Sequence, residues 1–282
     1  MSPQDNTFYI KFWVRSRLWF WAFVISCIVC FAIYLINASF WQVHPSSNWG
    51  IGYGIAAAIL VLGAAAYGIR RRRMKWVSKL GLGRSHTWVQ FHVYGGTLFL
   101  LLVFMHTGFR YPTGTLTIWL WYLSIWITLS GILGVILQKW IPRALTSGLK
   151  YEIHYERIPE LIHEIRQRAE EIIESCDESI REFYQNSLAA AFVGPETRWI
   201  YYMDITGGIR TQTKHFSYLR KLLPAEQRDK LDRLEQIYKT KLEIDAHYTL
   251  QKALRWWLYL HIPVSIVLIV LVGLHLYSVF YY

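Results

Sequence analysis

Acidic residues are almost absent from the first half of this 282-residue chain, which has no Asp or Glu between Asn6 and Lys150. Eighteen of the 19 acids lie between Glu152 and Asp245, where basic residues roughly balance them. The net charge of +11 therefore arises from short basic segments in the rest of the chain. This distribution is typical of loops that orient a membrane protein, and it does not favour a nucleic-acid partner.

Cysteine is also scarce, since three residues cannot build a disulfide framework. Cys27 and Cys30 form a C-x-x-C inside an apolar stretch, without the following His that covalent haem attachment uses, so we expect them to be packing residues. The chain has no phosphate-binding glycine loop, dinucleotide fingerprint or cysteine cluster for zinc or iron–sulfur. Cofactor chemistry, if this chain has any, is therefore expected in the apolar part.

Long apolar runs dominate what is present. Hydrophobic residues make up 54% of the chain, which has 14 Trp and 19 Tyr. A helix crosses a bilayer with about 20 residues, and aromatic residues concentrate at membrane interfaces. The sequence thus predicts an all-α membrane protein with five transmembrane helices and a mostly helical cytoplasmic insertion. The predicted spans are 18–38, 50–69, 88–109, 115–138 and 256–280.

Basic residues predict the orientation of these helices. The segment from Arg70 to Arg84 carries seven Lys or Arg and is expected on the cytoplasmic side. We therefore predict a multi-pass protein of the inner cell membrane, with the N-terminus and residues 141–254 in the cytoplasm and the C-terminus outside. The predicted division is 1–140 for helices one to four, 141–254 for the insertion, and 255–282 for helix five. Helices three and five then run in the same direction.

The insertion shows helical periodicity over 157–184, and Pro224 opens a second charged helix. Between these two segments, residues 197–208 predict a short strand that ends in a Gly-Gly turn. We expect the amphipathic helices to dock a soluble redox subunit, with plain solvation as the alternative.

Four histidines stand in the third and fifth predicted helices, and the spacing is fourteen residues in each: His92 and His106, then His261 and His275. Fourteen residues of helix rise about 21 Å and return to within about 40° of the same face. Because the two helices are predicted to be parallel, His92 should face His261 near the cytoplasmic surface. His106 should likewise face His275 near the outer surface.

Two facing imidazoles can bind a metal ion, share a proton or hold a haem iron from both sides. Zinc or copper sites and proton relays generally use further ligands or carboxylates, which the membrane segments lack. A bis-imidazole haem needs two axial ligands, an apolar cleft, and cations for its propionates. Candidate residues are Gly95, Gly96, Gly108 and Gly273 for close approach of a macrocycle, with Arg84 and Arg255 at the cytoplasmic end and Arg110 at the outer end.

The remaining histidines are expected to have no ligand role. His86 is predicted to be an interfacial polar residue. The others fall in loops or hydrophilic segments and are expected to be solvated: His44, His154, His163, His215 and His247.

The two His-x13-His helices resemble the dihaem cytochrome b family, the membrane core of quinol-oxidising complexes. The resemblance covers about 60 residues. It implies a four-helix bundle of helices two to five, with helix one as an addition, and two haem b with His92, His106, His261 and His275 as axial ligands. The chain departs from the family in its insertion and shows no recognisable quinone-site motif of the larger cytochrome b proteins.

A haem with both axial positions filled by protein transfers electrons and has no open position for substrate. The expected function is a dihaem b-type cytochrome subunit, the electron-transfer part of an oxidoreductase complex. It would carry electrons across the membrane between the quinone pool and a partner redox protein, with quinone or quinol as a further candidate ligand and other subunits as partners. Three alternatives stay open: a membrane anchor of a dehydrogenase or hydrogenase, a ferric-reductase-like carrier, and a haem-free scaffold or transporter.

Overall fold

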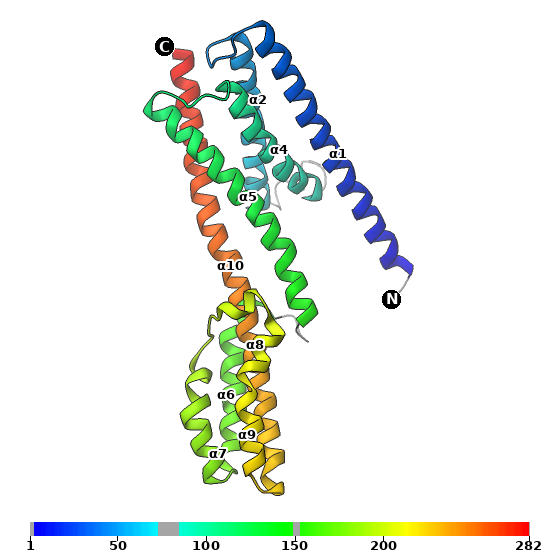
Figure 1. Cartoon of the computed structure of the whole chain (residues 1–282), viewed down its shortest axis with the longest axis vertical. Helices are drawn as coiled ribbons and strands as arrows, with labels where there is room; N and C mark the ends of the chain where they lie inside the picture. Colours follow the sequence, from blue (N-terminus) through cyan, green and yellow to red (C-terminus); the bar gives the residue numbers. More distant parts are fainter. Residues whose placement is uncertain (1–2, 73–84, 149–152, 282) are drawn as a thin grey trace. The chain divides into compact units, whose positions relative to one another are not determined.

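The described residues of the chain fold mainly into helices (Figure 1). The structure, a computed structural model, describes residues 3–72, 85–148 and 153–281. It divides into two units, one of Met1–Val135 with Leu258–Tyr282 and the other of Ile136–Trp257. Within the described ranges no residue lies in a strand, so the all-helical character is confirmed.

Among the residues that the structure describes, five helices are long and apolar enough to cross a membrane. They are α1 (Pro3–Phe40), α2 (Asn48–Arg72), α4 (Ser85–His106), α5 (Thr115–Gly148) and α10 (Ala225–Tyr281). Their apolar segments contain the five predicted spans in order, apart from a few terminal residues. The prediction of a multi-pass all-α membrane protein is therefore confirmed.

Short turns mark the start of α2 and the end of α4. The Ser47 hydroxyl accepts hydrogen bonds from the amides of His44 and Gly50, which satisfies donors at the start of α2. At the end of α4, Gly108 adopts φ 62°, and a Cβ there would lie 2.4 Å from the Val43 carbonyl oxygen. Glycine is thus required by this turn, both for its backbone conformation and for its close contact.

The first unit packs α2 against α4, which lie side by side in Figure 1. Its core also includes Leu268 of α10. Helix α1 contacts this pair through a ring contact between Phe23 and Tyr94 and a hydrogen bond of 2.9 Å from Asn37 to the Tyr53 hydroxyl. The buried residues of the core are Val43, Tyr53, Ala57, Val61, Phe99, Leu102, Met105 and Leu268.

The second unit has its own core, built mainly from α6 (Ile158–Glu174), α9 (Lys214–Leu222) and the charged part of α10. Shorter elements complete it: η2 (Tyr155–Arg157), α7 (Glu178–Phe183), η3 (Tyr184–Leu188), η4 (Ala189–Val193), η5 (Trp199–Tyr202) and α8 (Ile205–Gln212). The buried Ile162, Ile165 and Ala169 give α6 one apolar face, as the periodicity of the sequence predicts.

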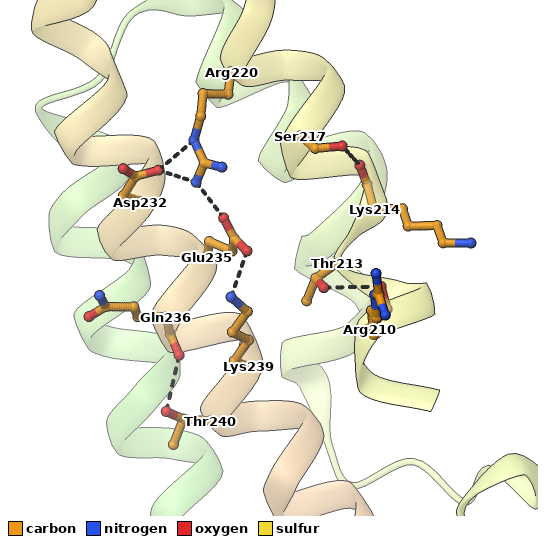
Figure 2. Close-up of polar contacts among 10 residues, drawn as sticks. All are labelled: Arg210, Thr213, Lys214, Ser217, Arg220, Asp232, Glu235, Gln236, Lys239 and Thr240. Carbon is orange, nitrogen blue, oxygen red and sulfur yellow. Dashed lines mark hydrogen bonds and ion pairs between the residues drawn. The ribbon is translucent and has the colours of Figure 1, made fainter. Parts of the chain in front are cut away.

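Charged residues form ion pairs on the outer faces of this unit. Figure 2 shows Arg220 of α9 bound to Asp232 and Glu235 of α10, and Glu235 in turn bound to Lys239. The Arg220–Glu235 and Glu235–Lys239 distances are both 2.7 Å. The two pairs of Arg220 connect α9 to α10, which agrees with the balance of acids and bases in this part of the sequence.

The prediction of a strand at 197–208 is wrong. Residues Trp199–Tyr202 form the 3-10 helix η5, and Ile205–Gln212 form α8. The aromatic residues that suggested a strand are divided between an exposed and a buried side of η5, with Trp199 82% and Tyr201 1% exposed. The Asp204 carboxylate accepts a hydrogen bond of 2.8 Å from the Gly207 amide, so a helix cap replaces the predicted Gly-Gly turn.

Helix α10 is also longer than the sequence indicated. The charged helix after Pro224 and the fifth apolar span form one helix from Ala225 to Tyr281, with Pro263 inside it. Proline is tolerated within membrane helices because neighbouring groups can compensate for the missing backbone donor. Two separately predicted helices are therefore parts of a single element.

Candidate functional site

The first histidine pair joins α4 to α10. The ring centroids of His92 and His261 are 6.3 Å apart, and the ring planes are inclined by 68°. His92 Nδ1 lies 2.8 Å from the backbone carbonyl oxygen of Ala64 on α2. His261, which is 9% exposed, has its Nδ1 2.8 Å from the Ser130 hydroxyl on α5. Four helices thus contribute to the surroundings of this pair.

The second pair repeats the arrangement further along the same two helices. The ring centroids of His106 and His275 are also 6.3 Å apart, with an interplanar angle of 77°. His106 Nδ1 lies 2.8 Å from the backbone carbonyl oxygen of Gly50. The structure therefore brings together all four histidines singled out in the sequence, in the pairs expected for parallel helices.

The residues of α2 that accept these hydrogen bonds have the same spacing as the histidines of α4. The acceptors on α2, Gly50 and Ala64, are fourteen residues apart, as are His106 and His92 on α4. Since the later residue of α2 meets the earlier residue of α4, these two helices are antiparallel. Their backbone positions hold both rings in the same way.

The separation of the paired rings matches one metal ion held between them. A five-membered ring with bonds of about 1.33 Å places each nitrogen about 1.1 Å from the centroid. A metal–imidazole nitrogen bond is about 2.0 Å. Two facing rings with one shared ion should therefore have centroids about 6.3 Å apart, which equals the separation in both pairs. A direct hydrogen bond of about 2.9 Å between the nitrogens would bring the centroids to about 5.2 Å.

The hydrogen bonds to Nδ1 decide which nitrogen of His92 and His106 can be a ligand. A backbone carbonyl oxygen only accepts, so Nδ1 carries the proton in each ring. In the neutral imidazole, Nε2 then has a lone pair. Metal-binding histidines are generally held through a hydrogen bond from their other ring nitrogen to a carbonyl or carboxylate. Both rings are thus prepared to bind a metal through Nε2.

His261 is held by a hydroxyl instead. The Ser130 hydroxyl donates to the carbonyl oxygen of Ile127 at 3.1 Å, and its oxygen is placed to accept from Nδ1 of His261. Ser130 could not be predicted from the sequence, because one serine in an apolar helix is generally a packing residue.

Two glycines that the sequence did not single out make room for the histidines. A Cβ on Gly54 would lie 2.8 Å from His106 Nδ1 and 3.0 Å from its Cε1. A Cβ on Gly131 would lie 3.6 Å from His261 Cε1, an ordinary contact. Of these two glycines, only Gly54 is therefore required by the position of a histidine ring. The only feature of the sequence that pointed to it was the cluster of glycines at 50, 52 and 54.

The four glycines proposed for macrocycle approach differ in their surroundings. A Cβ on Gly95 would contact Phe91 and Leu60 at 3.6–3.8 Å, whereas Gly96 and Gly273 have nothing within 4 Å of that position. Gly96 and Gly273 thus leave open space on the two helices that carry the histidines. Gly108 belongs to the turn after α4.

The three candidate propionate partners also differ. Arg84 lies outside the described residues. Arg110 is exposed in the turn after α4. Arg255 pairs with Glu156, and its guanidinium carbon lies 3.9 Å from the centre of the Tyr155 ring. The guanidinium of Arg255 is thus engaged within the second unit.

Of the other histidines, His44, His154, His163 and His215 are exposed, as expected. The expectation is wrong for His247, which is 2% exposed on α10, with its Nδ1 3.4 Å from the Gln251 amide nitrogen. Cys27, Cys30 and Cys176 are free cysteines. In the part of the chain that the structure describes, no group of three or more His, Cys, Asp or Glu could hold a metal ion.

Comparison of the chain with protein-family models, with curated proteins and with solved structures finds no match. Function is therefore inferred from the geometry of the two histidine pairs.

Proposed function

We propose that this chain is a dihaem b-type cytochrome subunit that carries electrons across a membrane. The observation that carries the proposal is the equal centroid separation of 6.3 Å in the His92–His261 and His106–His275 pairs. If the imidazoles only packed against their neighbours, two pairs with the same separation, at the same fourteen-residue spacing, would not be expected. The residues present thus fit two bis-histidine haems.

In each site, the two histidines would hold the haem iron through Nε2. The carbonyls of Ala64 and Gly50 fix the orientation of His92 and His106, and Ser130 does the same for His261. A bound haem b supplies a one-electron iron couple, and with both axial positions occupied it has no open position for substrate. Electron transfer is therefore the function that this ligand set favours.

The two sites are separated along the membrane-crossing helices. Fourteen residues of α4 rise about 21 Å, which is most of the hydrocarbon thickness of about 30 Å. One pair would thus lie toward each membrane surface. Helices α2, α4, α5 and α10 would form the haem-binding bundle, and α1 would be an addition to it.

The proposal also includes the partners and the orientation. The basic segment between Arg70 and Arg84 favours an inner-membrane protein with its N-terminus and residues 141–254 in the cytoplasm. Electrons would pass between the quinone pool and a partner redox protein, in a complex with other subunits. Co-purification from native membranes identifies those subunits.

The proposal is tested by a reduced-minus-oxidised absorption spectrum of the purified protein, with haem quantified as the pyridine haemochrome. We expect two b-type haems per chain. His106→Ala should remove or alter one of them and His261→Ala the other, whereas the exposed His44→Ala should keep both. A protein without haem, or a single haem unaffected by both substitutions, contradicts the proposal.

A further inference from the structure

Three apolar side chains project from the second unit around η5. Trp199 is 82% exposed, Ile200 45% and Met203 88%. They fall within five residues of one another, and the Trp199 ring packs against that of Tyr202 with centroids 5.5 Å apart. A concentrated group of large exposed apolar residues marks an interaction surface more often than scattered single ones.

The opposite side of η5 is firmly attached. Tyr201 is 1% exposed and packs in a cluster with Ile141 of α5 and Leu250 of α10. The Tyr202 hydroxyl donates to the Thr249 carbonyl oxygen at 3.2 Å, and the Arg198 amide donates to the Thr249 hydroxyl at 3.3 Å. Since these contacts fix which side of η5 faces inward, Trp199, Ile200 and Met203 are held outward.

The attachment points place η5 at the level of a membrane interface. Ile141 follows Trp140, which stands two residues after the predicted apolar span 115–138 of α5. On α10, Thr249 precedes Trp256 by seven residues, or about 10 Å of helix. The polar interfacial layer adds about 5–7 Å on each side of the hydrocarbon core, and Trp is enriched at that boundary. Both helices thus place η5 within reach of the lipid headgroups.

Cations lie at the same level. Lys139 is on α5 beside Trp140, and Lys252 of α10 lies with its Nζ 3.2 Å from the Thr197 hydroxyl. Basic residues near a membrane surface are attracted to anionic headgroups. The nearby acid Asp204 has its carboxylate turned to the Gly207 amide as the cap of α8.

We propose that Trp199, Ile200 and Met203 insert into the phospholipid headgroup region and anchor the second unit to the membrane surface. The occupant of this face is lipid because the two helices to which η5 is attached enter the membrane at this level. Apolar side chains beside cations are the usual composition of a segment that lies in the interface. The inference does not depend on haem binding.

The test uses the full chain in lipid nanodiscs of phosphatidylcholine and phosphatidylglycerol. The photoreactive residue p-benzoyl-phenylalanine replaces Met203 in one variant and Leu222 in another. Leu222 is a matched control because it is 82% exposed and stands at the end of α9, just before α10 begins. Position 225 precedes Leu250 by about 37 Å of helix, far from the attachment of η5.

After irradiation, adducts are identified by mass spectrometry. We expect at least fivefold more phospholipid adduct at position 203 than at position 222. Equal lipid adduct at both positions overturns the proposal, as does cross-linking of position 203 mainly to protein. Circular dichroism of both variants shows whether they retain the helical content of the unsubstituted protein. A second pair, Met203→Cys and Leu222→Cys in a cysteine-free chain, repeats the comparison by spin-label accessibility, where protection from a water-soluble relaxant at position 203 alone is expected.

Discussion

His106 of α4 and His275 of α10 face each other with ring centroids 6.3 Å apart. His92 and His261, fourteen residues earlier on the same two helices, have the same separation. This centroid separation is about 1 Å longer than that of two imidazoles joined by a hydrogen bond. It equals the sum of two metal–nitrogen bonds and the two distances from a ring nitrogen to its ring centroid. The separation in both pairs therefore fits the proposal that one metal ion lies between the two rings.

A side chain added at Gly54, beside His106, should disturb the His106–His275 pair and leave the His92–His261 pair unchanged. In Gly54→Ala, the new Cβ would lie 2.8 Å from His106 Nδ1, so the ring must move and its hydrogen bond to the Gly50 carbonyl is lost. Alanine is a better helix former than glycine by about 0.8–1 kcal/mol, so α2 itself should not be weakened. We expect the haem content to fall from two per chain toward one.

The matched control is Gly52→Ala on the same helix, where a Cβ meets nothing within 4 Å. This variant should retain both haems in the pyridine haemochrome assay. Equal haem content in the two variants would show that the contact between Gly54 and His106 does not matter for binding.

The Ser130 hydroxyl should affect the reduction potential of the proposed haem at His261. In Ser130→Ala the hydroxyl 2.8 Å from His261 Nδ1 is lost, and the imidazole becomes a poorer electron donor to the iron. Ferric iron loses more stabilisation than ferrous iron, so the reduction potential of this haem should rise while that of the other stays constant. A potentiometric titration followed by absorbance measures both potentials.

The conservative Ser130→Thr variant keeps a hydroxyl and should restore the original potential. Outer-shell changes of this kind commonly reduce metal affinity about 10–100-fold, so a lower occupancy of this haem in Ser130→Ala is also expected. Unchanged potentials in both variants would argue against a role for the hydroxyl.

The ring planes predict a magnetic signature. The paired imidazoles are inclined by 68° and 77°. Rings that are nearly perpendicular donate into different iron d orbitals, which keeps those orbitals close in energy. Both oxidised haems should therefore give low-spin electron paramagnetic resonance signals of large g anisotropy. Rhombic signals of small anisotropy, as expected for parallel rings, would contradict the ring orientations.

A buried ion pair in the second unit predicts a pH-dependent stability. Lys241 and Asp245, on the charged part of α10 ahead of Trp256, are both fully buried, with Nζ 2.5 Å from the carboxylate. Burial raises the pKa of Asp245 to about 6, although Lys241 and the Glu196 amide act to lower it. The folded state thus holds this proton more tightly than the unfolded state. The resulting stabilisation is complete below about pH 4 and is lost as the pH rises through about 6.

Lys241→Met tests this pair by leaving the carboxylate buried without its partner. We expect a loss of about 3–5 kcal/mol at pH 7, seen as a lower thermal unfolding midpoint, and a smaller loss at pH 5 where Asp245 binds a proton. The exposed pair of Asp229 and Arg233 provides the control, because Arg233→Met should change the midpoint little at either pH. A loss that does not depend on pH would assign the effect to packing alone.

Much of this protein was predictable from local pattern. The five apolar spans follow from run length, since an apolar helix of about 20 residues has few alternatives to a bilayer. The histidine pairs follow from helical periodicity together with the parallel direction of α4 and α10. The strand predicted at 197–208 failed because alternating aromatic residues fit a 3-10 turn with one buried side equally well. The join within α10 was missed because the change from charged to apolar residues suggested a boundary that no helix-breaking residue marks.

The four histidines and the helices on which they stand could be predicted from the sequence, because periodicity along one helix is a local property. Tertiary packing determines how three of these histidines, His92, His106 and His261, are held. The carbonyls of Ala64 and Gly50 have no sequence signature, since every residue carries one, and only packing of α2 against α4 selects them. The same holds for the hydroxyl of Ser130 and the space at Gly54, whose roles depend on the distance to a residue on another helix.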